Sequence, residues 1–319
     1  MRVLVIGGSG FIGPRLIDAL LERGHTVANL DATPSARHPE LTVLGDVRDR
    51  DRVVQAASGV DVIVNLAAAH RDDIRPLSLY DEINIGGAES VVAAAEAAGV
   101  SRILFTSTVA IYGLDNENAT EDSKPRPFND YGRTKLEAEQ RLIAWARRDA
   151  ARRLVIIRPS VVFGEGNRGN VYNLANQVAT GRFLMIGDGS NRKSMSYVGN
   201  IAAFLADHLD APSGVTVMNY ADKPDLSTRE IITIIEDQLG RRTGSVRLPL
   251  ALGLAGGHVL DLAARLTRRT FPISAVRIRK FVASTTVNTD RLLASGYRPR
   301  YSLEEALRRT VAAEFRDAP

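Results

Sequence analysis

A run of glycines near the amino terminus constrains this chain most. The stretch LVIGGSGFIGPRLI, residues 4–17, places Gly7, Gly10 and Gly13 three residues apart, directly after an apolar run. At such positions the first glycine allows a tight turn, the second lets a ligand approach the backbone closely, and the third lets a helix pack closely on a strand. We therefore expect a strand, a turn and a helix here, with the free N–H groups at the start of the helix facing a pyrophosphate.

A glycine-rich turn without a ligand has the same pattern, but two acids downstream favour the ligand. Asp31 ends the second expected strand, where a carboxylate can accept hydrogen bonds from ribose hydroxyls. A carboxylate there repels a 2′-phosphate and so favours NAD over NADP, although the nearby Arg37 keeps NADP open. Asp46, followed by Val47, comes after the third strand, where a short acid can bind an adenine amino group or simply cap a loop.

The first half of the chain alternates apolar strands with helical patterns. The strands are rich in Val, Ile and Leu, which is typical of parallel strands buried on both faces. Alternation of this kind predicts an α/β fold with a Rossmann-like, doubly wound parallel sheet. The expected strands are 2–8, 25–31, 41–47, 61–68, 102–108 and 153–159, and the expected helices are 12–23, 49–57, 84–98 and 131–150.

The second half has a looser pattern and predicts a smaller lobe. We expect residues 1–165 to form the NAD-binding domain, with segments near 195–220 returning to it, and residues 166–319 to form mainly a substrate-binding lobe. Ser302 stands three residues before Glu305 and predicts a capping box at the start of the last helix. The other expected elements are loops at 163–169 and 186–195, helices at 199–210 and 228–239, and a strand at 215–219.

Composition and charge exclude several classes of function. The net charge is only +4, from 41 basic and 37 acidic residues, and no block of like charges suggests nucleic-acid binding. The chain has no cysteine, and its five histidines have no metal-ligand spacing, so we expect no metal site. Nothing at the start resembles a signal peptide, and we expect a cytoplasmic protein.

The most apolar segment, residues 249–266, contains His258, Asp261 and Arg265 and is a poor membrane span. We expect no membrane insertion. A helix that is buried, or that lies at an interface, is the favoured interpretation, and a helix lying on a membrane surface is the alternative.

Two groups of polar side chains suggest acid–base chemistry. Tyr131 and Lys135 are four residues apart, so on a helix they share one face, where an ammonium group would lower the pKa of the phenol. Ser107 and Thr108 end an expected strand, and the carboxyl ends of strands border the ligand crevice in such sheets. A hydroxyl there can bind a substrate oxygen while the Tyr131 hydroxyl moves a proton. An exposed Tyr beside a solvated Lys, and ordinary turn chemistry, are the alternatives.

Together these motifs resemble those of the extended short-chain dehydrogenase/reductases, within the NAD-dependent epimerase/dehydratase group that acts on nucleotide sugars. The resemblance covers most of the chain. It rests on GGSGFIG at 7–13, Asp31, GDV at 45–47, NLAA at 65–68, Asn84, STVAIYG at 107–113, YGRTK at 131–135, RPSVVFGEGNRG at 158–169, and the segments 186–202 and 289–311.

The resemblance implies roles for the matching residues. Tyr131 would be the acid and base, Lys135 its partner on the nicotinamide ribose, and Thr108 the active hydroxyl, with Ser107 also on the substrate. NAD would contact Gly7, Gly10, Phe11, Ile12, Gly13, Asp31, Asp46, Val47, Leu66, Ala67, Ala68, Asn84, Tyr131, Lys135 and Pro159.

The resemblance also implies a basic residue for the substrate's diphosphate. Arg192 or Lys193 would take that role, although both also suit a solvated loop. Arg277, Arg279 and Lys280 are further candidates, and a basic surface is the alternative interpretation of these three.

Family members oxidise a sugar hydroxyl and differ in the step after this oxidation. Dehydratases carry an Asp-Glu pair after the active Thr, where this chain has Val109 and Ala110, so we do not expect dehydration. We expect an epimerase similar to UDP-hexose 4-epimerases, with a UDP-sugar substrate. Residues 191–205 and 271–274 resemble enzymes of surface-polysaccharide synthesis, some of which reduce 4-keto-6-deoxy sugars while others epimerise. The alternatives are therefore an NAD(P)H-dependent reductase of a 4-keto-6-deoxy nucleotide sugar in polysaccharide biosynthesis and a non-catalytic NAD(P)-binding regulator.

Two alanine-rich helices, 84–98 and 131–150, carry apolar stripes. In this family such helices pair across a two-fold axis, so the resemblance implies a homodimer. The alternative is that these stripes simply pack on the sheet.

Overall fold

The computed structural model describes residues 1–71, 73–114, 117–242, 247–267 and 275–315. The chain divides into two compact units. The first comprises Met1–Val162, Ser196–Asp222 and Val287–Tyr301, and the second comprises Phe163–Met195, Lys223–Thr286 and Ser302–Pro319. Residues 271–274, whose sequence suggested polysaccharide enzymes, lie outside the described residues.

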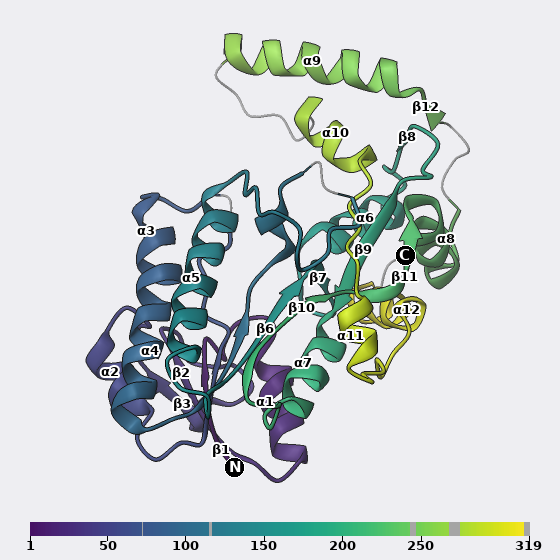
Figure 1. Cartoon of the computed structure of the whole chain (residues 1–319). Helices are drawn as coiled ribbons and strands as arrows, with labels where there is room; N and C mark the ends of the chain where they lie inside the picture. Colours follow the sequence, from purple (N-terminus) through teal and green to yellow (C-terminus); the bar gives the residue numbers. More distant parts are fainter. Residues whose placement is uncertain (72, 115–116, 243–246, 268–274, 316–319) are drawn as a thin grey trace. The chain divides into compact units, whose positions relative to one another are not determined.

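A seven-stranded parallel sheet forms the centre of the first unit (Figure 1). Its strand order is β10-β6-β5-β4-β1-β2-β3, and the direction of winding reverses between β1 and β4. Such a switch point is where doubly wound sheets bind their ligands. The strands are β1 (Arg2–Ile6), β2 (Thr26–Asp31), β3 (Thr42–Leu44), β4 (Val62–Asn65), β5 (Arg102–Thr106), β6 (Arg153–Pro159) and β10 (Gly214–Tyr220).

Helices cover both faces of this sheet (Figure 1). On one face, α1 (Gly13–Glu22) and α7 (Val198–Asp207) bury a cluster that includes Leu16 and Phe204. On the other, α2 (Arg50–Ala56), α4 (Gly87–Ala98) and α5 (Asp130–Ala146) bury a cluster that includes Leu142 and Trp145. The fold is therefore Rossmann-like. The remaining elements are the short helices η1 (Pro39–Leu41), α3 (Ser78–Tyr80), η3 (Val109–Tyr112) and α11 (Asp290–Ala294), and the π-helical turn η2 (Asp81–Gly86).

The second unit contains most of the remaining helices and short strands. Its helices are α6 (Asn170–Ala179), α8 (Thr228–Leu239), α9 (Leu250–Thr267), α10 (Ala275–Val282) and α12 (Leu303–Glu314). Strands β8 (Met185–Ile186) and β12 (Arg247–Leu248) pair with each other. Strands β7 (Val161–Phe163), β9 (Arg192–Tyr197) and β11 (Asp222–Ser227) form a sheet in the order β11-β9-β7. The capping box expected at Ser302 and Glu305 is confirmed at the start of α12.

Three expectations about individual segments are wrong. Strand β3 is not buried on both faces, because it is the edge strand, and Leu44 is 56% exposed. The loop expected at 186–195 includes the start of β9, because the polar residues from Arg192 onward pair in a sheet. The helix expected to end at residue 150 ends at Ala146.

The apolar segment 249–266 forms α9, but the expectation that this helix is buried is wrong for one of its faces. Leu252 is 60% exposed and Val259 is 66% exposed. Among the described helices, none is long and apolar enough to cross a membrane. The described residues also contain no group of side chains that could hold a metal ion.

Candidate active site

The glycine-rich turn joins β1 to α1 at the switch point of the sheet. Gly7 has φ +81°, and a Cβ there would lie 2.6 Å from the backbone nitrogen of Ala67, which follows β4. A Cβ at Gly13 would lie 2.2 Å from the Gly8 carbonyl oxygen, so this glycine lets α1 approach the turn. At Gly10 a Cβ would meet only the Gly7 carbonyl oxygen, at 3.3 Å. The turn is thus tight on the side of the protein and open at Gly10, as close approach of a diphosphate requires.

Asn29, which the sequence analysis missed, holds this turn in place. Its side chain is fully buried in β2. Its Oδ1 accepts a 2.9 Å hydrogen bond from the Gly8 N–H, and its Nδ2 donates to the hydroxyls of Ser9 and Thr42. A buried amide in an otherwise apolar strand was the available signal, because such a group must find partners.

Asp31 lies at the end of β2, next to the same turn. Its Oδ2 accepts a 2.9 Å hydrogen bond from the Ser9 N–H, and its Oδ1 accepts one of 2.9 Å from the Thr33 N–H. Arg37, which kept NADP open, instead pairs with Asp18 at 2.9 Å. The cation that the sequence suggested for a 2′-phosphate is therefore already paired, and the role of the Asp31 carboxylate toward ribose hydroxyls stays a prediction.

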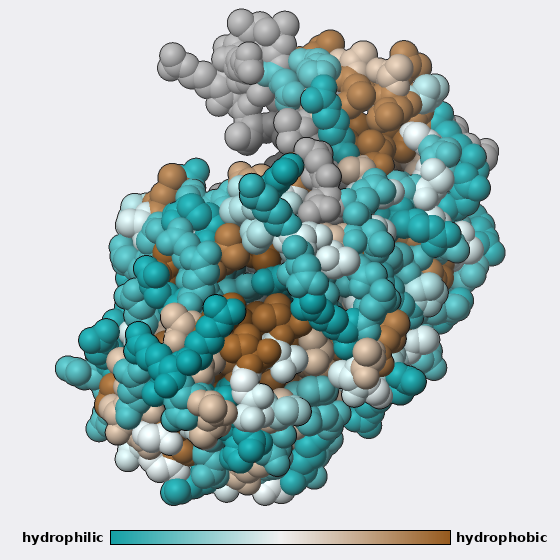
Figure 2. All heavy atoms as spheres, viewed as in Figure 1, coloured by the Kyte–Doolittle hydropathy of each residue, from teal (hydrophilic) through white to brown (hydrophobic). Residues whose placement is uncertain are grey.

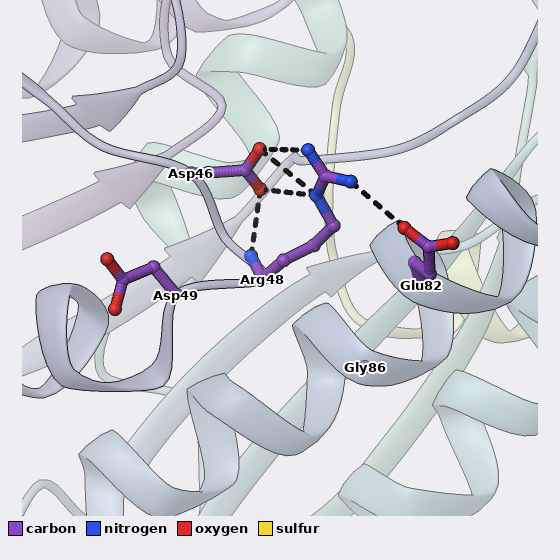
Figure 3. A pocket seen from close by; sticks show the side chains of 5 residues that line it. All are labelled: Asp46, Arg48, Asp49, Glu82 and Gly86. Carbon is purple, nitrogen blue, oxygen red and sulfur yellow. Dashed lines mark hydrogen bonds and ion pairs between the residues drawn. The ribbon is translucent and has the colours of Figure 1, made fainter.

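Asp46 lies in an open hollow lined by Asp46, Arg48, Asp49, Glu82 and Gly86 (Figure 3). Its carboxylate accepts hydrogen bonds of 2.7–3.1 Å from the Arg48 guanidinium, which lowers the pKa of Asp46. The same guanidinium reaches Glu82 at 2.9 Å. Val47 is buried against the sheet side of this region. The adenine role of Asp46 and Val47 stays a prediction, and Arg48 is a further polar group there that the sequence analysis did not weigh.

The residues after β4 form a second wall beside the glycine turn. Leu66 N–H donates to the Ile6 carbonyl at 2.8 Å, and Ala67 N–H donates to Asn65 Oδ1 at 3.1 Å. Ala68 continues this small-residue wall. We expected Leu66, Ala67 and Ala68 to let the cofactor lie against the sheet edge, and the close approach of Ala67 to Gly7 is consistent with that role.

Asn84 lies in the π-helical turn before α4 and fastens the loop after β4 to α5. Its Oδ1 accepts from the Ala69 N–H at 2.8 Å, and its Nδ2 donates to Thr134 Oγ1 at 2.8 Å. Thr134 stands between Tyr131 and Lys135 on α5. Asn84 therefore fixes the helix that carries both expected catalytic groups, and its own contact with a cofactor stays a prediction.

The structure brings Thr108 and Tyr131 together. Ser107 and Thr108 follow β5 directly, and the Thr108 side chain hydrogen-bonds the Tyr131 hydroxyl. Thr108 Oγ1 also accepts from the Ala110 N–H at 3.1 Å. Among the described residues, Ser107 Oγ is a buried hydroxyl with no hydrogen-bond partner. A buried polar atom without a partner, beside a Tyr–Thr pair, is suited to binding a substrate oxygen.

The electrostatics of the Tyr–Lys pair differ from the expectation. Burial raises the pKa of Tyr131, and only the hydrogen bond with Thr108 opposes it. Lys135 is 1% exposed, and its Nζ lies 4.0 Å from the centre of the Phe105 ring. Desolvation lowers the pKa of Lys135 to about 7. The expected lowering of the Tyr131 pKa by Lys135 is therefore wrong for the protein alone, because burial disfavours both charged forms.

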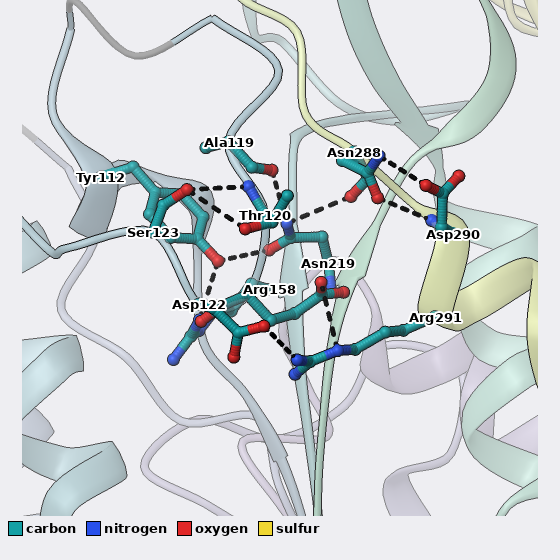
Figure 4. A network of polar contacts seen from close by, with 11 residues as sticks. Tyr112, Ala119, Thr120, Asp122, Ser123, Arg158, Asn219, Asn288, Asp290 and Arg291 are labelled. Atoms are coloured by element: carbon teal, nitrogen blue, oxygen red, sulfur yellow. Dashed lines mark hydrogen bonds and ion pairs between the residues drawn. The ribbon is translucent and has the colours of Figure 1, made fainter.

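A buried ion pair joins α5 to β6, and the sequence analysis missed it. Arg158 Nη2 lies 2.7 Å from Glu139 Oε2, and both side chains are buried. Arg158 also donates to the Tyr112 hydroxyl, which in turn donates to Asn219 Oδ1, each at 2.7 Å (Figure 4). Glu139 is one turn beyond Lys135, and its charge partly opposes the lowering of the Lys135 pKa. This network ties α5 to β6, which ends at Pro159, and to β10.

The basic residues expected at the substrate diphosphate lie in the second unit. Arg192 Nη1 donates to the Asp225 carbonyl at 2.6 Å. Lys193 Nζ donates to the Ala283 carbonyl, and burial lowers the pKa of Lys193 to about 8. Both belong to β9, so the alternative of a solvated loop is wrong. In α10, Arg279 is exposed, whereas the side chains of Arg277 and Lys280 lie outside the described part of the chain.

These features fit NAD. The glycine turn is open at Gly10, α1 begins at Gly13 after Phe11 and Ile12 with its N–H groups at the turn, and Asp31, the predicted ribose ligand, lies beside it. Bound NAD would be held by the turn and by Asp31, and it would bring hydride chemistry to the strand ends near Thr108 and Tyr131.

A substitution of Gly7 tests the role of the glycine-rich turn. Gly7→Ala should lower the free energy of unfolding by about 3 kcal/mol and weaken NAD binding at least tenfold, because the new Cβ meets the Ala67 backbone and φ is positive. Gly24→Ala is the matched control, because Gly24 also has positive φ (+74°) but no atom within 4 Å of its Cβ position. Urea unfolding and NAD titration of both variants check this. Equal losses of stability, with NAD affinity intact in both, would contradict the assignment.

The comparisons with known proteins identify the family of this chain. The family model "NAD dependent epimerase/dehydratase family" matches residues 3–219. A relative from Escherichia coli O157:H7, "N-acetyl-alpha-D-glucosaminyl-diphospho-ditrans,octacis-undecaprenol 4-epimerase", is 44% identical over 98% of this chain and 95% of its own length. A "2-alkyl-3-oxoalkanoate reductase" from Stenotrophomonas maltophilia is 29% identical, covering 98% of this chain and 99% of its own.

Solved structures give the same fold. The Thermus thermophilus UDP-glucose 4-epimerase in complex with NAD has a TM-score of 0.76 and 25% identity, with full coverage of both chains. The cofactor is NAD, and the enzyme is an epimerase or oxidoreductase of the extended short-chain dehydrogenase/reductase type. The chain thus belongs to the NAD-dependent epimerase/dehydratase family, whose members include nucleotide-sugar epimerases.

Proposed function

We propose that this protein inverts carbon 4 of an N-acetylhexosamine that is joined through a diphosphate to a long polyprenol. The acid–base chemistry is carried by one observation, the contact of the Thr108 side chain with Tyr131 at the carboxyl end of β5, next to the partnerless Ser107 hydroxyl. The choice of carrier is supported by the relative that is 44% identical over nearly the whole chain and whose name states such a substrate.

Tyr131 moves the proton in this scheme. Its hydroxyl removes the proton of the sugar's 4-hydroxyl and later returns it to the 4-keto oxygen, while Thr108 holds the Tyr131 oxygen in place. NAD, when bound, supplies the hydride acceptor and donor for the sugar carbon. Lys135 contacts the nicotinamide ribose, and in its protonated form its positive charge favours the charged form of Tyr131. Ser107 donates a hydrogen bond to a sugar oxygen.

The residues after Thr108 argue for epimerisation rather than loss of water. Elimination needs an acid and a base near the sugar, and Val109 and Ala110 cannot move a proton. An epimerase needs only the Tyr131 group, because the same proton that is removed is returned. The sugar must turn over between the two steps, which requires that it be held chiefly by its diphosphate.

A UDP-hexose is the second candidate substrate. It is favoured by the UDP-glucose 4-epimerase structure, which covers the whole chain at 25% identity. Both candidates are hexose-type sugars joined to a diphosphate, and they differ in the N-acetyl group and in the carrier. For either substrate, we propose that Arg192 and Lys193 contact the diphosphate. We also propose that the protein is cytoplasmic and that it forms a homodimer through α4 and α5.

A substrate panel distinguishes the candidates. Purified protein is incubated with N-acetylglucosamine diphosphate on a short, water-soluble prenol, with UDP-N-acetylglucosamine, with UDP-glucose, and with a 4-keto-6-deoxy nucleotide sugar plus NADH. We expect the carbon-4 epimer of the prenol-linked sugar, detected by NMR, without net change in NADH absorbance. Turnover of UDP-sugars alone would move the assignment to the second candidate. Stoichiometric loss of NADH with the keto-sugar alone would make the protein a reductase and overturn the proposal.

A further inference from the structure

Helix α9 begins with a stretch that carries no charge. Residues 249–260, PLALGLAGGHVL, contain no Asp, Glu, Lys or Arg. The helix itself spans Leu250–Thr267. In a helix at a protein surface, a polar face normally alternates with the apolar one. An uncharged run of this length at a surface therefore calls for a partner other than water.

One face of α9 already packs within the second unit. A Cβ at Gly253 would lie 2.8 Å from the side chain of Ile186 in β8, and a Cβ at Gly257 would lie 2.8 Å from the Ala275 backbone in α10. Asp261 accepts a 3.1 Å hydrogen bond from the Ala275 N–H. The Gly253–Gly257 face is thus the inner face, and β8 and α10 are its partners.

The opposite face is apolar and exposed. Leu252 and Val259 are 60% and 66% exposed, and Ala255, between them at helical spacing, is exposed too. Leu250 at the start of the helix is 39% exposed. Figure 2 shows hydrophobic residues gathered over the amino-terminal half of α9, at the top of the view. A contiguous exposed patch of this kind marks an interaction surface rather than the scattered apolar residues of an ordinary surface.

The sequence after the patch is strongly basic. Between Asp261 and Asp290 there is no acidic residue, and the stretch contains Arg265, Arg268, Arg269, Arg277, Arg279 and Lys280. Arg279 in α10 is exposed. An apolar helix face that is followed in the sequence by basic residues without acidic ones is the composition of segments that lie in the interface of an anionic bilayer, with leucines in the acyl boundary and cations at the headgroups.

We propose that α9 binds the surface of an anionic membrane, with the Leu252–Val259 face in contact with lipid. A second copy of this chain fits less well, because two strongly basic sequences repel each other, whereas an anionic bilayer attracts them. Since α9 does not qualify as a membrane span, the helix lies on the bilayer. This inference rests on the proposed function, because a polyprenol carrier is itself held in the membrane and the enzyme must meet its sugar there.

Vesicle co-sedimentation tests the surface. The full-length protein is mixed with vesicles of phosphatidylethanolamine and phosphatidylglycerol, and with vesicles of phosphatidylcholine alone. We expect binding to the anionic vesicles that weakens at high salt. The double variant Leu252→Asp/Val259→Asp should bind them at least about tenfold more weakly. The matched control is Leu21→Asp/Leu293→Asp, which replaces two exposed leucines of the first unit (41% and 48% exposed) and should bind like the wild type.

The outcomes separate this inference from its alternatives. Equal sedimentation of wild type and the α9 variant would overturn it. A molar mass that falls in the α9 variant, with no binding of vesicles by the wild type, would assign the face to a second copy and would also overturn it. Epimerisation of the short-prenol substrate is measured on the same proteins. Turnover without vesicle binding would refute membrane binding by α9 and leave the proposed function standing. Vesicle binding without turnover would refute the proposed function and leave membrane binding by α9 standing.

Discussion

Replacing Tyr131 by Phe should lower kcat by a factor of about 10²–10⁴, because the variant loses the hydroxyl that we propose moves the proton of the sugar hydroxyl. The change removes one oxygen atom, and the Thr108 hydroxyl keeps its 3.1 Å hydrogen bond from the Ala110 N–H. We therefore expect the fold to persist. NAD affinity should be unchanged, because the glycine turn and Asp31 do not contact this hydroxyl.

Steady-state kinetics and NAD titration check this prediction. The control is Tyr172→Phe, which removes a hydroxyl from a ring that stacks on Phe315 in the second unit, and it should keep wild-type kcat. If the Tyr131 variant turns over within a few-fold of the wild type, Tyr131 is not the acid and base. If it loses NAD binding as well, the phenol serves the cofactor rather than the proton.

Replacing Lys135 by Met should abolish turnover and yet stabilise the protein. A fully buried amine whose pKa falls from 10.5 to about 7 carries an unfavourable free energy on the order of 4 kcal/mol relative to water. Met has nearly the same length and no charge. The contact of Nζ with the Phe105 ring is lost, so we expect a net gain of about 2 kcal/mol near pH 7.

The pH dependence of the free energy of unfolding tests the direction of the Lys135 pKa shift. Between about pH 7 and 10.5 the unfolded chain holds a proton on Lys135 that the native protein has released. Wild-type stability should therefore rise with pH in that window, by up to about 1.4 kcal/mol per unit, and the rise should be missing from Lys135→Met. Urea unfolding at several pH values measures it. Lys124→Met, at an exposed lysine, is the control and should follow the wild type. A variant that is less stable than the wild type at every pH would refute the buried, partly neutral lysine.

Much of the site was predictable because its signals are local. The order of strands and helices, the glycine spacing, Asp31 at a strand end and the Tyr131–Lys135 spacing are each written within a few residues of sequence. A strand end and a helix face then determine where such side chains point, as for Thr108 and Tyr131.

The remainder depends on contacts between distant residues. Asn29 reaches the Gly8 N–H, Arg158 pairs with Glu139, and Arg48 covers Asp46 only after the sheet has assembled. The burial of Lys135, which reverses the expected electrostatics of the pair, arises from Phe105 on another strand. The exposure of α9 could not be read from its composition either, because an apolar helix suits a core as well as a surface.

The fate of the hydrogen on carbon 4 tests the central claim most directly. A substrate labelled with deuterium at that carbon is epimerised in ordinary water, and the product is examined by mass spectrometry and NMR. If the site oxidises and restores the sugar with its own cofactor, the deuterium remains on carbon 4 of the epimer. Loss of the label to water would show that the protein inverts the carbon by removing and replacing a proton, and it would contradict the roles assigned here to NAD and to Tyr131.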